Sequence, residues 1–293
     1  VDVWDPEVFA ATSRYFKFDL RVRSEDEMAD EYRSQQLMAV VLGWDDRTVS
    51  GRPAISNDWL AALQRRHSDV FVCFGGVDPW RGREAIQEAE RAVRELGLRG
   101  FKFQQAAQRF FPSDRRFYPL WQTIQALGVP ALFHCGTTGL GAGAPGGLGV
   151  KLKYVQPIHV DEVAADFPDL QIIAAHPAWP WQDEMIAIAV HKANVWIDLS
   201  GWSPRYFPPE LVRELNGRLQ DKALFGTDYP FLTPERWLRD FEAIDLEPEV
   251  RPKILKENAK RLLGIGGPHP PAPRSALVPS PSRGRGRSGP LSP

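Results

Sequence analysis

A (β/α)₈ barrel is the fold that this 293-residue sequence predicts, on three observations. Short, continuous apolar runs recur along residues 1–265, which is typical of parallel strands buried on both faces. Segments with apolar residues at three- and four-residue spacing alternate with these runs, so parallel strands joined by right-handed helical crossovers are expected. No GxGxxG sequence follows the first strand, which favours a barrel over a doubly wound sheet.

Seven strands are expected from the apolar runs, at residues 37–44, 70–77, 98–103, 129–136, 170–177, 194–200 and 222–230. An eighth strand would come from "VDVW" at the start of the chain or from sequence upstream of Val1. Helices are expected at residues 83–97, 118–128, 160–168, 181–193, 208–220, 234–244 and 249–265, with Gly97 and Gly128 closing the first two.

A change of composition near residue 265 predicts two regions. Residues 1–265 form the barrel domain. Residues 266–293 contain eight prolines, five glycines, four arginines and no acid. Such a segment buries too little apolar surface to offset its ordering entropy, so a disordered tail is expected there.

Composition excludes several classes of function. The formal net charge is −1, which gives no electrostatic case for nucleic acid or an anionic membrane as a partner. No apolar run approaches the length of a membrane span, and no signal segment opens the chain. The two cysteines, Cys73 and Cys135, cannot build a disulfide framework, so a reducing, cytoplasmic setting is expected.

Polar residues collect where the predicted strands end, which is where a barrel of this kind carries its chemistry. In chain order these residues are Trp44, Asp45, Asp78, Lys102, His134, His176, Asp198 or Ser200, and Asp228. The gaps between His134, His176 and Asp228 fit one and two strand–helix units, so the three side chains would face one mouth. Two imidazoles and a carboxylate predict a site for a divalent metal ion, with Zn²⁺ as the first choice.

Other residues are candidates for binding a small-molecule substrate. Lys102 would lie near the metal, bind an anionic substrate or neutralise a buried acid. Lys153 and Arg205 would bind a carboxylate, phosphate or phenol, and Trp179 would wall an aromatic ring. The glycine-rich stretch at residues 139–154 has the length of a lid or substrate loop.

Five stretches together resemble the amidohydrolase-related family, in the branch of metal-dependent hydrolases that includes aminocarboxymuconate-semialdehyde decarboxylase. They are "VPALFHCG", "IIAAHP", "VWIDLSGW", "ALFGTDYPF" and "ILKENAKRLLGI". The resemblance implies that His134 and Asp228 are metal ligands. It implies that His176 is the acid/base group beside a metal-bound water or a further ligand.

The activity that the resemblance implies first is hydrolysis of a small aromatic or acyl-type carboxylic substrate by metal-activated water. Stretches such as "GFKFQ" and "HPAWPWQDE" also look like hydrolases of 4-hydroxyphenyl-β-ketoacyl-CoA. Decarboxylation or hydration by a similar metal site is the alternative, as is a degenerate barrel that only binds a partner. A homo-oligomer is plausible from the resemblance alone.

One departure from the family pattern concerns the first strand, which carries His-x-His in the family. No His-x-His occurs in this chain. Either the motif lies upstream of Val1, the interpretation we favour, or "VDVW" is an altered first strand with Asp2 and Trp4 at those positions.

Overall fold

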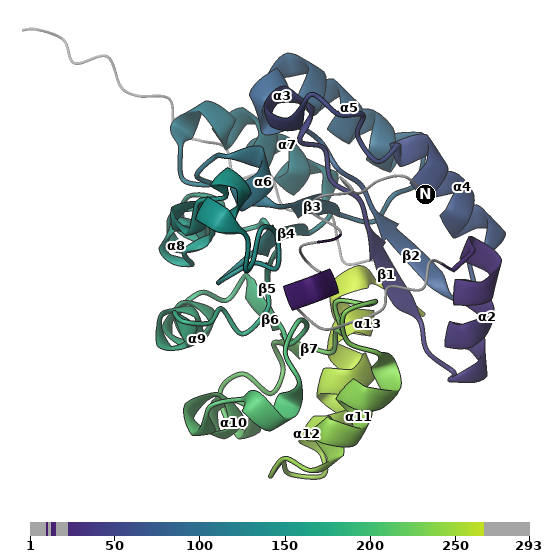
Figure 1. Ribbon diagram of the computed structural model, residues 1–293, viewed down its shortest axis with the longest axis vertical. Helices are drawn as coiled ribbons and strands as arrows, with labels where there is room; N and C mark the ends of the chain where they lie inside the picture. The colour runs from purple at the N-terminus through teal and green to yellow at the C-terminus, as the bar shows by residue number, and fades with distance from the viewer. Residues whose placement is uncertain (1–9, 11–12, 16–22, 267–293) are drawn as a thin grey trace, which may run out of the picture.

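The structure, a computed structural model, describes residues 10, 13–15 and 23–266, and places seven parallel strands inside a ring of helices (Figure 1). The strands are β1 Ala39–Leu42, β2 Phe71–Phe74, β3 Phe101–Phe103, β4 Ala131–His134, β5 Ile172–Ala175, β6 Val195–Asp198 and β7 Ala223–Leu224. All seven lie within the predicted runs, so the barrel prediction is confirmed strand by strand in this part of the chain. The alternative first strand with Asp2 and Trp4 lies outside the described residues, as does the tail from residue 267 onward.

The strands follow one another around the wall in sequence order. β1 pairs with β2, and β3 to β7 form a second sheet in which each strand pairs with the next. A single bridge between Gly75 and Phe101 connects the two sheets. Among the described residues β7 and β1 are not paired, so the wall is open between them.

Helices cover the outside of the wall (Figure 1). The longer ones are α2 Glu25–Ser34, α4 Asn57–Arg66, α5 Arg83–Arg94, α7 Tyr118–Leu127, α8 Ile158–Asp166, α9 Gln182–His191, α10 Pro209–Asn216 and α11 Pro234–Glu242. Short elements are α3 Arg47–Ser50, η1 Pro79–Arg81, α6 Gln105–Gln108, η2 Arg115–Phe117, η3 Pro145–Gly149, η4 Leu152–Val155 and η5 Pro204–Tyr206.

Two of the predicted helices are corrected by the structure, and two further helices are present. α5 ends at Arg94, so Gly97 lies beyond its cap, whereas Gly128 caps α7 in a left-handed conformation as predicted. The predicted helix at 249–265 consists of α12 Val250–Pro252, the π-helical turn η6 Lys253–Glu257 and α13 Asn258–Leu263. Helices α2 and α4 were not expected, although Ser24 and Ser56 cap them through their side chains.

The alternation of strand residues divides the core into two parts. Outward-facing residues such as Phe101, Phe103 and Phe133 pack under the helices in the larger cluster. Inward-facing residues form a smaller cluster inside the barrel: Phe74, Leu132, Ile173, Ala175, Trp196 and Leu224, joined by Leu262 and Leu263 of α13. Since Arg99, just before β3, donates to the Leu263 carbonyl, α13 closes the amino end of the barrel. The polar site therefore lies at the other end.

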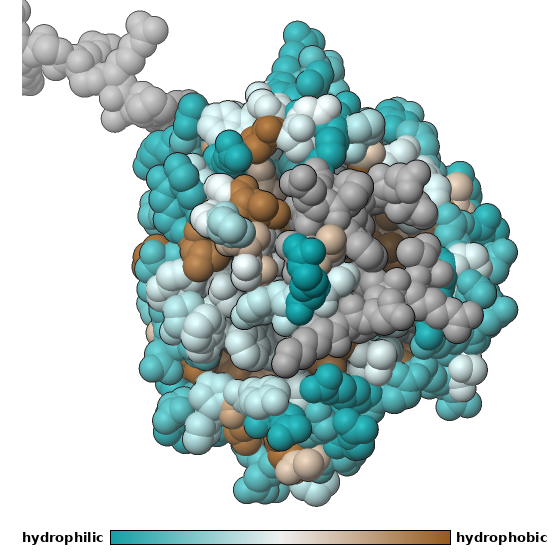
Figure 2. Space-filling model, viewed as in Figure 1, coloured by the Kyte–Doolittle hydropathy of each residue, from teal (hydrophilic) through white to brown (hydrophobic). Residues whose placement is uncertain are grey.

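The surface in the same view is mostly hydrophilic, with apolar side chains in separate patches (Figure 2). Within the described part of the chain, no helix has both the length and the apolar composition needed to cross a membrane.

Candidate active site

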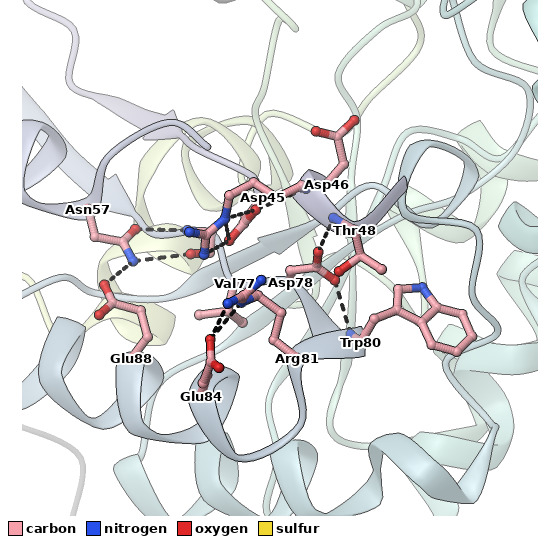
Figure 3. Close-up of polar contacts among 12 residues, drawn as sticks. Asp45, Asp46, Thr48, Asn57, Val77, Asp78, Trp80, Arg81, Glu84 and Glu88 are labelled. Atoms are coloured by element: carbon pink, nitrogen blue, oxygen red, sulfur yellow. Dashed lines mark hydrogen bonds and ion pairs between the residues drawn. The ribbon is translucent and has the colours of Figure 1, made fainter. Parts of the chain in front are cut away.

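Asp45, three residues after β1, and Asp78, four residues after β2, hold loops in place. Asp45 accepts hydrogen bonds from the guanidinium and the backbone N–H of Arg47. Asp78 accepts from the backbone N–H groups of Thr48, at 2.7 Å, and Trp80, at 3.0 Å (Figure 3). Both carboxylates are buried and have local partners, so these two strand-end positions are structural.

A different group of strand-end side chains converges inside the barrel. Lys102 on β3, His134 on β4 and His176 just after β5 are all less than 9% exposed. The two imidazole rings lie 4.6 Å apart between centroids, in an edge-to-face arrangement. Asp198 at the end of β6 and Asp228 in the loop after β7 both interact electrostatically with Lys102. The structure thus brings Lys102, His134 and His176 together, whereas Asp228 is exposed and is connected to them by its electrostatic interaction with Lys102.

His134 is fixed by its own loop and by the preceding strand. Its Nε2 donates to the Thr137 carbonyl at 3.1 Å, which leaves Nδ1 with a free lone pair. The Gln105 side chain binds the backbone of His134 at both its N–H, at 3.0 Å, and its carbonyl, at 3.1 Å. Burial, with the neighbouring His176 and Lys102, holds the pKa of His134 well below its usual range. His134 is therefore a neutral imidazole with Nδ1 available.

His176 is oriented by the strand that follows it. Its Nδ1 lies 3.0 Å from both the carbonyl and the Oγ of Ser200, and Ser200 Oγ donates to Asp198 at 3.0 Å. Because the carbonyl only accepts, Nδ1 carries the hydrogen and Nε2 has the free lone pair. His176 has a φ of 76°, a left-handed conformation that turns its ring away from the regular alternation of β5. The chain Asp198–Ser200–His176 positions an imidazole whose Nε2 can exchange a proton.

Lys102 is the buried cation of this cluster. Desolvation lowers its pKa from 10.5 to about 8, against the opposing effect of Asp228 and Asp198. Burial also raises the pKa of Asp198, with His176 and Ser200 acting in the opposite direction. The lysine is therefore easily deprotonated for its type, and it interacts with both acids of the site.

Asp228 does not end a strand, as the apolar run at 222–230 had predicted. β7 stops at Leu224, and Asp228 lies four residues later with a φ of 59°. Gly226, two residues after the end of β7, packs tightly on Asp198: a Cβ at this glycine would meet Asp198 Oδ1 at 2.2 Å. The prediction of the strand's length was wrong, although Asp228 still faces Lys102 electrostatically.

The donor types suit a divalent metal, but the described residues supply only part of a site. His134 Nδ1 and His176 Nε2 are free imidazole nitrogens, each with the other ring nitrogen facing a backbone carbonyl, as metal-binding histidines require. However, in residues 23–266 and the described residues before them, no three His, Cys, Asp or Glu side chains are close enough together to hold an ion.

The other predicted substrate-binding residues lie farther out. Lys153 is exposed and lies over the rings of Phe111 and Tyr154, and Arg205 is exposed and lies over Tyr206. Trp179 is 48% exposed, and its carbonyl accepts from the Thr137 N–H at 2.7 Å, so it borders the His134 loop. Of these three residues, Trp179 is the one that a hydrogen bond connects to the His134 loop.

Burial raises the pKa of the Cys135 thiol to about 12, so the thiol beside His134 stays protonated near neutral pH. The sequence pattern assigned no role to Gln105, which directly follows the "GFKFQ" stretch, and marked Ser200 only as an alternative to Asp198. The signal that could have identified both residues is a polar side chain, an amide or a hydroxyl, directly after a predicted strand.

Two buried imidazoles and a buried lysine, with carboxylates nearby, at one end of a parallel (β/α) barrel define an enzyme of the barrel class. A family model described as Amidohydrolase matches residues 13–265, and the chain belongs to that family. The resemblance seen in the strand-end motifs is thereby confirmed.

Relatives of known activity and solved structures agree with this family. A gamma-resorcylate decarboxylase of Polaromonas sp. strain JS666 is 25% identical, over 84% of this chain and 87% of the relative. An uncharacterized TIM-barrel protein of Bordetella bronchiseptica has a TM-score of 0.73 and 26% identity, over 88% of this chain and 90% of the other.

A dihydroxybenzoic acid decarboxylase of Polaromonas sp. JS666, solved with manganese and 2-nitroresorcinol, has a TM-score of 0.61 at 19% identity. The match covers 89% of this chain and 90% of that one. It supports the fold of the present chain.

Proposed function

We propose that this protein is a metal-dependent decarboxylase of a small hydroxylated aromatic acid. The observation that carries the proposal is the buried cluster of Lys102, His134 and His176, with the exposed Asp228 within electrostatic range of Lys102. The chain is also 25% identical to a gamma-resorcylate decarboxylase over most of its length. This is the alternative that the sequence predicted second, and it is favoured over hydrolysis because the related enzymes release carbon dioxide from aromatic acids.

Decarboxylation requires the site to bind and polarise the anionic acid and to supply a proton to the ring carbon. The bond between the ring carbon and the carboxylate breaks, and its electron pair stays on the ring carbon. That carbon takes a proton, and carbon dioxide leaves. A ring hydroxyl beside the carboxylate makes the carbon electron-rich enough to accept the proton, which explains why the proposed substrate is hydroxylated.

The residues of the site can meet these two requirements. We assign proton transfer to His176 Nε2, which would take a proton from solvent and pass it to the ring carbon, since Asp198 and Ser200 hold the other ring nitrogen. Lys102 in its ammonium form would attract the anionic acid into a buried site. We assign His134 and Asp228 to the divalent ion, with zinc and manganese as the candidates. When bound, that ion supplies positive charge that polarises the oxygens of the substrate.

Product analysis tests the proposal. The full chain, supplied with manganese or zinc, is incubated with 2,6-dihydroxybenzoate in D₂O. We expect resorcinol and carbon dioxide in equal amounts, with one deuterium on the carbon that carried the carboxylate. His176→Gln should lower the rate by about 10²- to 10⁴-fold, the usual contribution of an acid/base group. His191→Gln, at an exposed histidine of α9, is the matched control and should leave the rate unchanged.

Other results would favour the alternatives. Release of a free thiol and an acid from an aromatic β-ketoacyl thioester, without carbon dioxide, would support the hydrolase that the sequence predicted first. No turnover of either substrate, with metal supplied, would favour the non-catalytic barrel.

A further inference from the structure

The amide of Gln104 is buried but incompletely hydrogen-bonded. Gln104 is 5% exposed, and its Nε2 donates to Thr138 Oγ1 at 3.4 Å. Its Oε1 has no hydrogen-bond partner among the described residues. A buried amide oxygen without a partner costs free energy, so folding alone gives no reason to keep a glutamine here.

The conclusion does not depend on which end of the amide is oxygen. Thr138 Oγ1 already accepts from the Leu140 N–H at 3.2 Å, so its own hydrogen is free to donate. If the amide were turned over, Thr138 would donate to Oε1, and the NH₂ group would then be left without a partner. In either orientation one end of the buried amide of Gln104 is unsatisfied.

Gln104 lies at the site described above. It follows the last residue of β3, two positions after Lys102, so the alternation of the strand places it on the inner face. Phe103 pairs with Phe133, and continuing this register sets Gln104 beside His134. The next residue, Gln105, binds the backbone of His134. The unsatisfied amide is therefore at the mouth that holds the two imidazoles.

We propose that Gln104 is a substrate-binding residue whose amide oxygen accepts a hydrogen bond from a ring hydroxyl of the aromatic acid. This inference rests on the proposed function, because it takes the substrate class from it. A ring hydroxyl is a good donor for an amide oxygen, whereas a carboxylate can only accept. Gln104 would thus select acids with a hydroxyl on the side of the ring that faces β3.

Binding of an unreactive phenol tests this role apart from turnover. The manganese-supplied full chain is titrated by calorimetry with 2-nitroresorcinol and with 2-nitrophenol, which has one hydroxyl fewer. We expect Gln104→Met to bind 2-nitroresorcinol about tenfold more weakly than the wild type, the effect of one lost hydrogen bond at a buried site. Gln104→Glu keeps an acceptor and should bind within about threefold of the wild type.

The second ligand and a control variant make the test specific. Wild type should prefer 2-nitroresorcinol over 2-nitrophenol, and Gln104→Met should lose most of that preference. Gln125→Met on α7, where the amide oxygen is also unsatisfied but lies away from the site, should bind as the wild type does.

Thermal unfolding separates binding from a structural role. Gln104→Met should unfold at the wild-type temperature or higher, because it removes an unsatisfied buried group. The inference is overturned if Gln104→Met binds 2-nitroresorcinol as tightly as the wild type, or if the wild type binds neither phenol. Binding without decarboxylation would instead reject the proposed function and leave the role of Gln104 supported.

Discussion

Burial in the barrel lowers the pKa of the Lys102 ammonium group from 10.5 to about 8, while Asp228 and Asp198 act in the opposite direction. Above pH 8 the folded protein therefore releases a proton that the unfolded chain keeps until about pH 10.5. The titration of Lys102 therefore raises the free energy of unfolding as the pH rises from about 8 to 10.5, and below pH 8 this increase is absent.

Lys102→Met removes this dependence. We expect the free energy of unfolding of the wild type, relative to Lys102→Met, to rise by about 2 kcal/mol between pH 7 and 9.5. Lys222, whose pKa burial also lowers to about 8, contributes to both proteins and cancels in the difference. Urea unfolding at the two pH values measures the effect. An unchanged difference would mean that Lys102 does not titrate in this range.

The sequence predicts individual site residues only where it predicts the end of a strand. Lys102, His134 and His176 follow apolar runs, and the structure brings them together. The same rule also selected Asp45 and Asp78, which hold loops. The rule could not separate the two sets, because their hydrogen-bond partners come from turns whose geometry the sequence pattern does not give.

Among the elements, the turn after β6 sets the position of His176. Gly201 has a φ of +75°, and a Cβ there would lie 2.5 Å from His176 Nδ1. Gly97 has the same φ of +75° with no atom within 4 Å of its Cβ position. Replacing each glycine by alanine adds a methyl group in the same backbone conformation. That methyl group contacts His176 at position 201 and no other residue at position 97.

Gly201→Ala and Gly97→Ala should both lose about 1–2 kcal/mol of stability, the cost of a left-handed conformation for an alanine. Gly201→Ala should in addition displace His176 and lower the decarboxylation rate at least about tenfold. Gly97→Ala should keep the wild-type rate. Equal rates in both variants would show that the position of His176 does not depend on this turn.

The connection between β3 and β4 depends on the amide of Gln105, which binds both backbone groups of His134. Gln105→Met should lower the free energy of unfolding by about 1–3 kcal/mol, because it leaves those groups without partners. It should also weaken metal binding, which dialysis against a chelator measures.

Gln64→Met is the control for this change. The Gln64 side chain binds the backbone of Cys73, in β2, and of Gly97. Its replacement should cost similar stability and leave metal binding unchanged. Loss of metal in both variants would attribute the effect to general destabilisation.

Element boundaries were harder to predict than element types. The apolar run at 222–230 predicts a strand that the structure ends at Leu224, and the close contact of Gly226 with Asp198 beyond that point is a tertiary one that the run does not show. Helix α2 was missed because charged residues dominate it, and only Ala29 and Tyr32 are buried. Weak apolar periodicity cannot predict a helix of that kind.

At the scale of the molecule, the order of strands and the closing role of α13 explain why the chemistry lies at one end. Leu262 and Leu263 fill the amino end of the barrel, and the polar groups occupy the other. The strand–helix alternation predicted this arrangement. The described wall is open between β7 and β1, as the prediction of seven strands plus an eighth from "VDVW" or from upstream of Val1 implies.

The central claim is that His134 and Asp228 belong to one divalent-metal site, and metal content measures it most directly. The full chain and its variants are equilibrated with manganese or zinc, freed of loose ions, and analysed by mass spectrometry. We predict about one ion per wild-type chain, and a large loss in His134→Ala and in Asp228→Ala, since each removes a ligand. His191→Ala should retain the ion. Equal metal content in the wild type and the His134 and Asp228 variants would contradict the account.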